Sequence, residues 1–326
     1  MELILATPDG REIGVLTYDF DIQIGDENTF EITMPSACWN SNISFGSLVY
    51  VPGTEYGGIV KDIATSTSED KIYVRGYTWR GYLVHRIIEP PSGQDYMIVS
   101  GELNTVMNSV LNNSLGSLFR VSSASTGVSV TSYQFARYVD FVTGISAMLG
   151  TKSYRLQIEY KQTDTSGYVQ ISAVPIVNYG DEISQDYRLN FAMDDDRTGI
   201  NHLICLGQGE LKDRTVVHLY ANTNGVISQT KTQTGINEIV DVYDNTAAED
   251  ATALIEAGTA HFVELLSTKT FKVTFDSTDD VNIGVGDTVT GRDYITSNTI
   301  TKPIIRKIIS RSNGVEKIEY KVEGEN

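Results

Sequence analysis

The segment Lys71-Ile72-Tyr73-Val74-Arg75 interleaves apolar and charged residues, and this pattern indicates the fold of the first part of the chain. Alternation with a period of two is typical of a β-strand with one buried face. Similar short runs precede it, separated by turn-forming Gly, Pro, Asp and Ser residues: Leu3-Ile4-Leu5, Phe30-Glu31-Ile32-Thr33, Leu48-Val49-Tyr50-Val51 and Gly58-Ile59-Val60. Many short strands at this spacing predict a first β-domain over residues 1–90, built as a barrel or a sandwich.

The pattern becomes helical after about residue 90. Apolar residues recur at helical spacing in two segments, one around Leu103 to Leu111 and one from Phe135 to Leu149. We expect Ser100 to cap the first helix, Gly116 to end it, and Gly150 to end the second. Alternating residues at 156–160 and 168–171 then indicate a hairpin. These elements predict a separate α+β domain over residues 91–195.

A second β-domain is predicted over residues 196–326. Strand-like runs occupy residues 201–206 and 216–220, and Asn313-Gly314 between two apolar runs is a strong hairpin signal. One helix near 246–267 is inserted, because Thr246-Ala247-Ala248-Glu249 fits a capping box and the apolar residues after it have helical spacing. The sequence therefore predicts a mainly β protein with an α+β domain and an inserted helix.

The chain is long and strongly acidic. It has 326 residues, with 42 acidic against 25 basic residues and a formal net charge of −17. This length predicts two or three domains, because single cores stop growing at about 250–300 residues. A nucleic-acid-binding surface needs clustered Lys and Arg to neutralise phosphates, and the charge balance argues against one. An acidic wall instead repels a duplex and lets it slide past, so DNA is expected only as passing cargo.

Signals for membranes and export are missing from the sequence. No stretch approaches the roughly 20 consecutive apolar residues of a membrane helix, so we expect no direct membrane insertion. The N-terminus has no basic region and only a short apolar run, which predicts synthesis and folding in a cytoplasm. The two cysteines, Cys38 and Cys205, have apolar or aromatic neighbours and are expected to be buried free thiols.

The histidines and glycine-rich stretches give no catalytic signature. The four histidines form no close pair of the H-x-x-x-H type, so we expect structural roles: His85, His202 and His218 in strand-like runs and His261 in a helix. No G-x-S-x-G elbow or P-loop occurs. Gly207-Gln208-Gly209 and Gly284-Val285-Gly286-Asp287 do not lead into helical patterns and are expected to be turns between strands.

Acidic residues give no clear metal site either. Asp194-Asp195-Asp196 lacks the spaced pattern of a calcium loop and is expected to be a solvated turn. With 42 acidic residues, a pair of carboxylates that suits glycoside hydrolysis will arise by chance. We therefore predict no catalytic, cofactor-binding or metal-binding residue and no enzymatic activity.

Several segments spread along the chain resemble a family of tail proteins, the hub or tail-associated proteins of phages and prophages of Gram-positive bacteria. The matching segments are Val51-Pro52-Gly53-Thr54-Glu55-Tyr56-Gly57-Gly58-Ile59-Val60, Gly76-Tyr77-Thr78-Trp79-Arg80-Gly81, Ile87-Ile88-Glu89-Pro90-Pro91-Ser92-Gly93, Ser100-Gly101-Glu102-Leu103-Asn104, Asp196-Arg197-Thr198-Gly199-Ile200-Asn201-His202-Leu203-Ile204 and Gly286-Asp287-Thr288-Val289-Thr290-Gly291-Arg292-Asp293. They are specific to the family as a set, and none of them is a catalytic signature.

The resemblance implies a hub in which two small β-barrels resemble tail-tube subunits and the other domains decorate them. Three copies would then join a six-fold tail tube to a three-fold tail tip or spike. The implied partners are the chain itself in a homotrimer, the tail tube and distal tail proteins, the tape-measure protein, and tip, spike or fibre proteins. The implied location is the distal end of the virion tail, after assembly in the host bacterial cytoplasm.

Two other functions remain open from the sequence alone. Many such hubs continue into a peptidase, lysozyme-like or receptor-binding extension, whereas this sequence stops at Asn326 after its last hairpin, so we expect those activities in other chains. The alternatives are a cell-wall hydrolase and a carbohydrate-binding tip protein, the latter suggested only by 18 tyrosines. Trp39 and Trp79 are either interface anchors or, as we expect, core residues.

Overall fold

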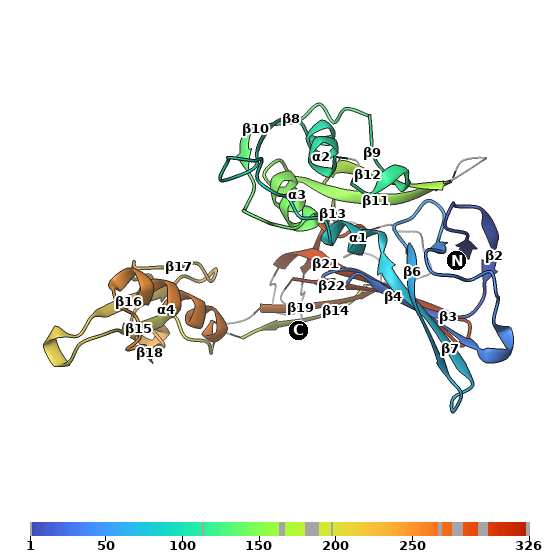
Figure 1. The fold of residues 1–326 in the computed structure, drawn as a ribbon. Coiled ribbons are helices and arrows are strands. Elements are labelled where there is room, and N and C mark those ends of the chain that lie inside the picture. The colour runs from blue at the N-terminus through green and yellow to red at the C-terminus, as the bar shows by residue number, and fades with distance from the viewer. Residues whose placement is uncertain are drawn as a thin grey trace. The chain divides into compact units, whose positions relative to one another are not determined.

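The computed structural model describes residues 2–112, 114–162, 167–179, 189–196, 198–266, 269–275, 283–292 and 299–323 (Figure 1). Contacts divide the chain into two compact units. Unit 1 contains Met1–Phe191 and Val273–Glu323, and unit 2 contains Ala192–Lys272. Among the helices described, none combines the length and the apolar character needed to cross a membrane.

Unit 1 is built around an eleven-stranded sheet that contains strands from both ends of the chain. The strands are β1 (Leu3–Ala6), β2 (Glu12–Leu16), β3 (Asp19–Gly25), β4 (Thr29–Pro35), β5 (Leu48–Tyr50), β6 (Gly57–Ser66), β7 (Lys71–Thr78), β13 (Asn178–Tyr179), β20 (Thr288–Arg292), β21 (Thr299–Ser312) and β22 (Val315–Val322). Their order is β13-β20-β21-β3-β4-β7-β6-β5-β1-β2, with β22 paired to β21. The strands predicted in residues 1–90 are all present, and the mainly β fold class is confirmed.

The last strands of the chain complete the sheet of the first strands. Asn313 and Gly314 both have positive φ, 53° and 79°, as a tight hairpin turn requires, and this confirms the predicted hairpin β21–β22. Strand β21 also pairs antiparallel with β3, with Ile309 opposite Ile22. The described residues therefore group differently from the predicted ranges 1–90, 91–195 and 196–326, because one long strand joins the C-terminal hairpin to the N-terminal sheet.

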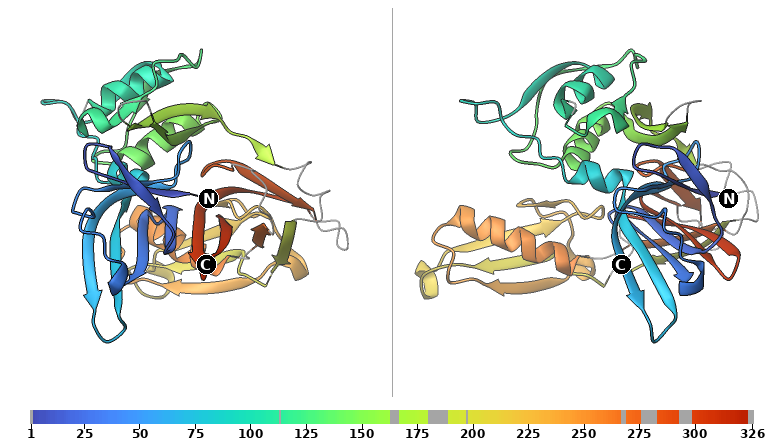
Figure 2. Two further views of the ribbon diagram at one scale, coloured as in Figure 1. Left: turned by 90° about the vertical axis from the view of Figure 1, so that its right-hand side faces the viewer. Right: turned by 45° about the vertical axis from the view of Figure 1, so that its right-hand side comes forward.

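One face of this sheet is apolar and the other is polar. In β3 the residues Phe20, Ile22 and Ile24 are buried and alternate with partly exposed polar residues. Strands β4 and β7 have the same alternation. Buried residues from β1 to β7 form one core cluster together with Ile309 of β21, so the sheet wraps around its apolar face. Figure 2 shows the hairpin of β6 and β7 extending away from the rest of the sheet.

An α+β lobe packs on this sheet within unit 1. Its helices are α1 (Trp79–Val84), α2 (Leu103–Leu111) and α3 (Phe141–Gly150), and its strands are β8 (Ile98–Glu102), β9 (Phe119–Val121), β10 (Ser129–Gln134), β11 (Tyr154–Gln162) and β12 (Gly167–Pro175). Short 3-10 turns lie at Ser36–Cys38 and Gly116–Leu118. The predicted hairpin is the pair β11–β12, in which Ile158 lies opposite Ile171.

The predicted starts of both lobe helices and the predicted end of α2 were wrong, whereas α3 ends at Gly150 as predicted. Helix α2 is capped by the Glu102 side chain instead of Ser100, and it ends at Asn112, which takes the left-handed conformation, before Gly116 is reached. Helix α3 begins after Asp140, whose side chain accepts from the Thr143 amide. The segment from Phe135 to Val139 is not helical, although Phe135 is buried, so its apolar residues pack from a loop.

Strands β1 and β5 join the lobe to the sheet because both of their faces are buried. Leu3, Leu5 and Val49 belong to the sheet core. Ile4, Ala6, Leu48 and Tyr50, on the opposite face of the same strands, belong to the lobe core. The two cores are therefore separated by one layer of backbone. This explains why these strands are continuous apolar runs in the sequence.

Unit 2 is a four-stranded sheet covered on one face by a helix. Its strands are β15 (His202–Leu206), β16 (Val216–Ala221), β17 (Ile227–Ser228) and β18 (Val240–Asp244), in the order β17-β16-β15-β18. Helix α4 (Ala251–Leu265) packs on Leu203, Cys205 and Leu219. Strands β14 (Leu189–Asp195) and β19 (Lys269–Phe275) pair with each other, and 3-10 turns lie at Leu211–Asp213 and Gly235–Asn237.

The inserted helix is present, but its predicted start was wrong. The Asp250 side chain accepts from the Ala253 amide and caps α4, so Thr246 and Glu249 do not form a capping box. The helix comes with its own sheet, which the sequence pattern did not separate from the strands of unit 1. Gly258 lets α4 approach the sheet closely, because a Cβ atom there would lie 2.5 Å from the Cys205 Sγ atom.

Candidate assembly surfaces

A polar face covers strands β3, β4, β6 and β7 on the side opposite the sheet core. We define this polar face by the outward residues Asp19, Asp21, Gln23, Thr29, Glu31, Thr33, Asp62, Lys71, Tyr73 and Arg75. The register places Asp21, Glu31, Arg75 and Asp62 in one row across the four strands. All are at least partly exposed, so none of the described elements buries the face.

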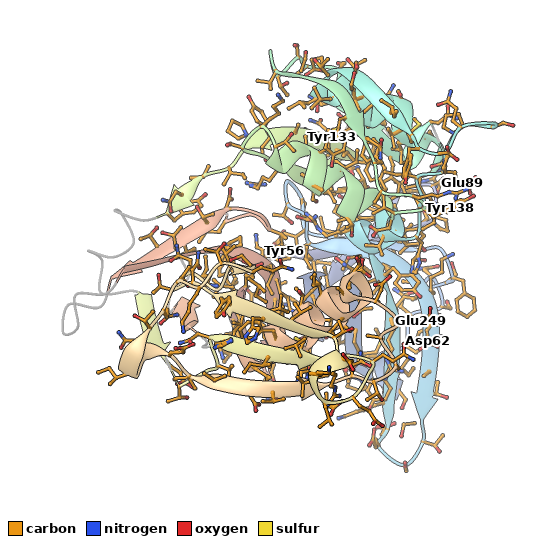
Figure 3. The ribbon with its side chains drawn as sticks, turned by 90° about the vertical axis from the view of Figure 1, so that its left-hand side faces the viewer. Tyr56, Asp62, Glu89, Tyr133, Tyr138 and Glu249 are labelled. Atoms are coloured by element: carbon orange, nitrogen blue, oxygen red, sulfur yellow. The ribbon has the colours of Figure 1, made fainter. Side chains whose placement is uncertain are left out.

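The polar face is acidic. Asp19, Asp21, Glu31 and Asp62 outnumber Lys71 and Arg75. The Arg75 Nε atom lies 2.5 Å from Glu31 Oε2, and its Nη1 atom lies 3.4 Å from Asp62 Oδ2. These pairs are screened by water and contribute little to stability. The Asp62 side chain, labelled in Figure 3, is 57% exposed and keeps most of its contact with solvent.

The segments that resemble the tail family all contain buried residues, although many of their other residues are exposed, including most of 87–93. Glu55 and Arg80 come from two different segments, and their side chains form an ion pair of 2.7 Å at 11% and 2% exposure. Asp287, from a third segment, is fully buried and lies 2.6 Å from the Arg155 Nε atom. Lys307 lies 4.5 Å from the centre of the Tyr56 ring, and burial lowers the pKa of its ammonium group to about 8. These residues hold the lobe on the sheet.

The aromatic residues at this joint form a stack. The Tyr50 and Tyr160 rings are 3.8 Å apart, and the Trp79 ring stacks on Tyr160 at 5.6 Å. Trp79 is fully buried, as expected for a core residue. Trp39 lies on an exposed loop and is 39% exposed, so the expectation of burial was wrong for this residue. Backbone and aromatic atoms leave little space beside the Trp79 ring, since a Cβ atom on Gly57 would lie 2.8 Å from the Trp79 Nε1 atom.

Glu102 is the residue that fixes another family-like segment. Its carboxylate accepts hydrogen bonds from the Thr105 amide at 2.9 Å and from the amide and hydroxyl of Thr126 at 2.8 and 2.7 Å. Partial burial acts to raise the pKa of Glu102, but these hydrogen bonds outweigh it and lower the pKa to about 2. The carboxylate therefore caps α2 and ties the 122–128 loop to it.

Acid should release this contact. The pKa of Glu102 is below its ordinary value of 4.5, so the stabilisation is complete above pH 4.5 and is lost as the pH falls toward about 2. We expect Glu102→Gln to lower the free energy of unfolding by about 1–2 kcal/mol at pH 7. The loss should shrink at pH 3. Thermal unfolding followed by circular dichroism at both pH values measures this, and an equal loss at both would contradict it.

The histidines of unit 2 come together in a way that the sequence did not indicate. Antiparallel pairing of β15 and β16 places His202 beside His218, with His202 Nε2 at 2.8 Å from His218 Nδ1. The side chain of Glu238 lies 2.7 Å from His202 Nδ1. His261 lies in α4 and stacks on Tyr243, as expected for a helix residue. His85 caps α1 and is exposed, so its predicted strand position was wrong.

The remaining predicted features have structural explanations. Within the described ranges, no group of three or more His, Cys, Asp or Glu side chains is arranged to hold a metal ion. Cys205 is buried, whereas Cys38 is exposed, which corrects the expectation for Cys38. Asp196 accepts from the Thr198 amide and hydroxyl in a turn. Asp194 and Asp195 instead end strand β14, so the predicted turn was wrong for these two residues, and their side chains lie outside the described residues. Arg197 and Asp293 also lie outside them.

A second open surface lies on the sheet face of unit 2 that α4 does not cover. Its residues come from β15, β16 and β18, and three valines on it are about half exposed: Val216 at 46%, Val240 at 47% and Val242 at 54%. His218 belongs to the same face, because it lies opposite Ile204 and diagonally to His202. These two faces, one acidic and one mixed, are exposed surfaces of unit 1 and unit 2.

Comparison with known proteins identifies the fold. No family model matches the sequence, and no curated protein matches it. The 43 kDa tail protein of prophage MuSo2 from Shewanella oneidensis has a similar structure, with a TM-score of 0.51 and 14% identity. The similarity covers 99% of this chain and 98% of that one. A tail protein from Neisseria meningitidis MC58 has a TM-score of 0.50 and 11% identity, covering 99% of this chain and 96% of that one.

A prophage tail protein from Listeria monocytogenes EGD-e covers 100% of this chain and 96% of its own, with a TM-score of 0.49 and 12% identity. The Shewanella and Neisseria structures show that the fold of this chain is one that tail proteins use, one of them from a prophage, and they confirm the predicted resemblance at that level. The restriction to Gram-positive hosts stays a prediction.

Proposed function

We propose that this chain is the structural hub at the distal end of a phage-type tail, where three copies form a ring between the six-fold tail tube and the three-fold tip or spike. The observation that supports this most is the similarity of fold over 99% of the chain to two tail proteins, one of them from a prophage. The proposal assigns no catalytic step. Its partners are the tail tube and distal tail proteins, the tape-measure protein, and tip, spike or fibre proteins.

The pairing of β3 with β21 supports a ring built from tube-like domains. In this proposal one tube-like domain contains the strands of residues 1–90, and the other contains β20, β21 and β22 from the predicted range 196–326, whereas β15 to β18 of that range belong to unit 2. Strands β3 and β21 join the two within a single chain through six residue pairs. Contacts of the same kind between copies would close the ring and cover exposed strand edges such as β2, which lies at the end of the sheet order.

The acidic polar face supports an assignment of the channel wall. A wall with a net excess of carboxylates repels the phosphates of DNA at every point and does not bind them. We assign the polar face to the lumen of the ring, where DNA passes as cargo. The apolar face of the same strands is already filled by the sheet core and is not available for contact with another protein.

Cryo-electron microscopy of the intact particle tests this proposal. We expect three copies in a ring directly below the tail tube, with Asp21, Glu31 and Asp62 pointing into the channel. Native mass spectrometry of the purified chain should give a trimer as its main assembled species. Location on an outer fibre, or a different copy number, would contradict the hub. A ring whose channel is lined by another surface would contradict only the assignment of the polar face.

A further inference from the structure

We propose that strand β18 of unit 2 is a docking edge, to which a partner protein adds an antiparallel strand that alternates apolar and basic residues. Strand β18 lies at the end of the sheet order β17-β16-β15-β18 (Figure 1). Each of its residues except Tyr243 is exposed. The opposite edge of the same sheet, β17, has a length of two residues and offers much less backbone. This inference concerns unit 2 alone and does not depend on the hub assignment.

Alternate backbone groups of β18 point away from the sheet. Strand β18 pairs parallel with β15, and at the end of this ladder the Asn245 amide donates to the Leu206 carbonyl at 2.8 Å. Every second residue of a parallel strand bonds to a given neighbour. The N–H and C=O groups of Val240, Val242 and Asp244 therefore face outward, where an added strand can bond to them.

One of these outward amides bonds only to a side chain next to it. The Val242 amide donates to Oδ1 of the preceding residue, Asp241, at 2.8 Å. This bond agrees with an amide that the β15 ladder does not use. A partner strand replaces it with a backbone carbonyl and frees the Asp241 carboxylate. A basic residue of the partner can then pair with this carboxylate.

The charge of this part of unit 2 favours a basic partner. Between Lys231 and Lys269 the sequence contains seven Asp or Glu residues and no Lys or Arg. This segment forms both β18 and α4. A second copy of the chain would bring the same acidic segment against itself, and like charges across a strand pair are destabilising. The edge therefore disfavours its own copy and favours a strand that contains Lys or Arg.

The two faces of β18 determine the pattern of the partner strand. Val240 and Val242 lie on the open sheet face and are 47% and 54% exposed. Asp241 lies on the opposite face together with Tyr243, whose ring stacks on His261 of α4 at 4.5 Å. Residues directly opposite each other in an antiparallel pair share a face. The partner should therefore place apolar residues opposite the two valines and a basic residue opposite Asp241.

Fluorescence anisotropy with the full chain tests this edge. The probe is a fluorescein-labelled peptide with capped ends, Lys-Val-Lys-Val-Lys-Val-Lys, at about 0.15 M ionic strength, which screens attraction between distant charges. We expect Val242→Pro to weaken binding by about tenfold or more, because proline removes an outward N–H and leaves the β15 ladder intact. Asp241→Asn should weaken binding more than Asp62→Asn, which removes an exposed carboxylate from unit 1.

Two backbone-methylated forms of the peptide test the strand geometry without any change to the protein. In the antiparallel arrangement the valines direct their backbone groups toward β18, and the lysines direct theirs away. Methylation of the valine backbone nitrogens should therefore abolish saturable binding, whereas methylation of the lysine backbone nitrogens should preserve it.

Three results would overturn the proposal. The first is the absence of saturable binding of the parent peptide. The second is equal affinity of the parent peptide for wild type and Val242→Pro. The third is a peptide that binds equally well with and without methylated valines, which would show attraction of a cation to an acidic surface without strand addition.

Discussion

Asp287→Ala is expected to destabilise unit 1 by about 3–5 kcal/mol, because it removes one partner of a buried ion pair. Asp287 is fully buried, and its Oδ1 atom accepts from Arg155 Nε at 2.6 Å and from the Val177 amide at 2.9 Å. Its Oδ2 atom accepts from the Gly284 amide at 2.8 Å. Alanine leaves the Arg155 charge and two backbone amides without this acceptor, and water has little access to replace it.

Urea unfolding followed by tryptophan fluorescence measures this loss. Both tryptophans, Trp39 and Trp79, belong to unit 1, so the signal reports that unit and not unit 2. The matched control is Asp62→Ala, which removes a carboxylate that is 57% exposed and pairs with Arg75 at 3.4 Å. We expect the control to change the free energy of unfolding by less than about 1 kcal/mol. Similar losses of stability in both variants would show that Asp287 contributes no more to the free energy of unfolding than an exposed carboxylate does.

Local features of the fold were predictable from the sequence because short-range physics determines them. The turn Asn313-Gly314 needs two residues that tolerate positive φ, and both have it. The alternation in 154–162 and 167–175 gave the hairpin directly. Helix starts were less predictable: the two candidate caps, Ser100 and Thr246, were wrong because Glu102 and Asp250 take that role.

Long-range features could not be read from the sequence. The pairing of β3 with β21 joins residues almost 300 positions apart. The alternation of apolar and polar residues in a strand does not indicate which other strand pairs with it. The polar face was visible only as alternation within single strands, so the row of Asp21, Glu31, Arg75 and Asp62 required the register. The histidine pair also depends on register, because its two members come from different strands. The resemblance to tail proteins was predictable from the family-like segments, but the buried ion pairs that Glu55, Arg80 and Asp287 form within them were not.

Arg80→Met is the second change with a large expected effect, about 3 kcal/mol at pH 7, because it leaves Glu55 buried without its cation. Arg80 is 2% exposed, and its Nε atom lies 2.7 Å from Glu55 Oε1. The Nη2 atom of Arg80 is buried and has no hydrogen-bond partner among the described residues, so the native arrangement already includes an unsatisfied polar group.

The double variant Glu55→Gln/Arg80→Met tests whether stability requires the two charges themselves or only that neither charge is buried without its partner. Replacing both charged groups by neutral ones of similar size avoids the cost of an uncompensated buried charge, so we expect stability within about 1 kcal/mol of wild type. Arg75→Met, in a pair with Glu31 at 41% exposure of each side chain, is the matched control and should change stability by less than about 1 kcal/mol. The measurement is again urea unfolding followed by tryptophan fluorescence.

A stable double variant would mean that Glu55 and Arg80 must be matched to each other, and that the charges themselves add little to the stability of the joint. A double variant as unstable as Arg80→Met would contradict this. It would show that the guanidinium group of Arg80 and its contacts with the lobe stabilise the joint. In either case the lobe, the sheet and the loop that contains Glu55 meet at this pair. A family-like sequence segment can therefore be explained by the assembly of one chain, before any contact with a second copy is considered.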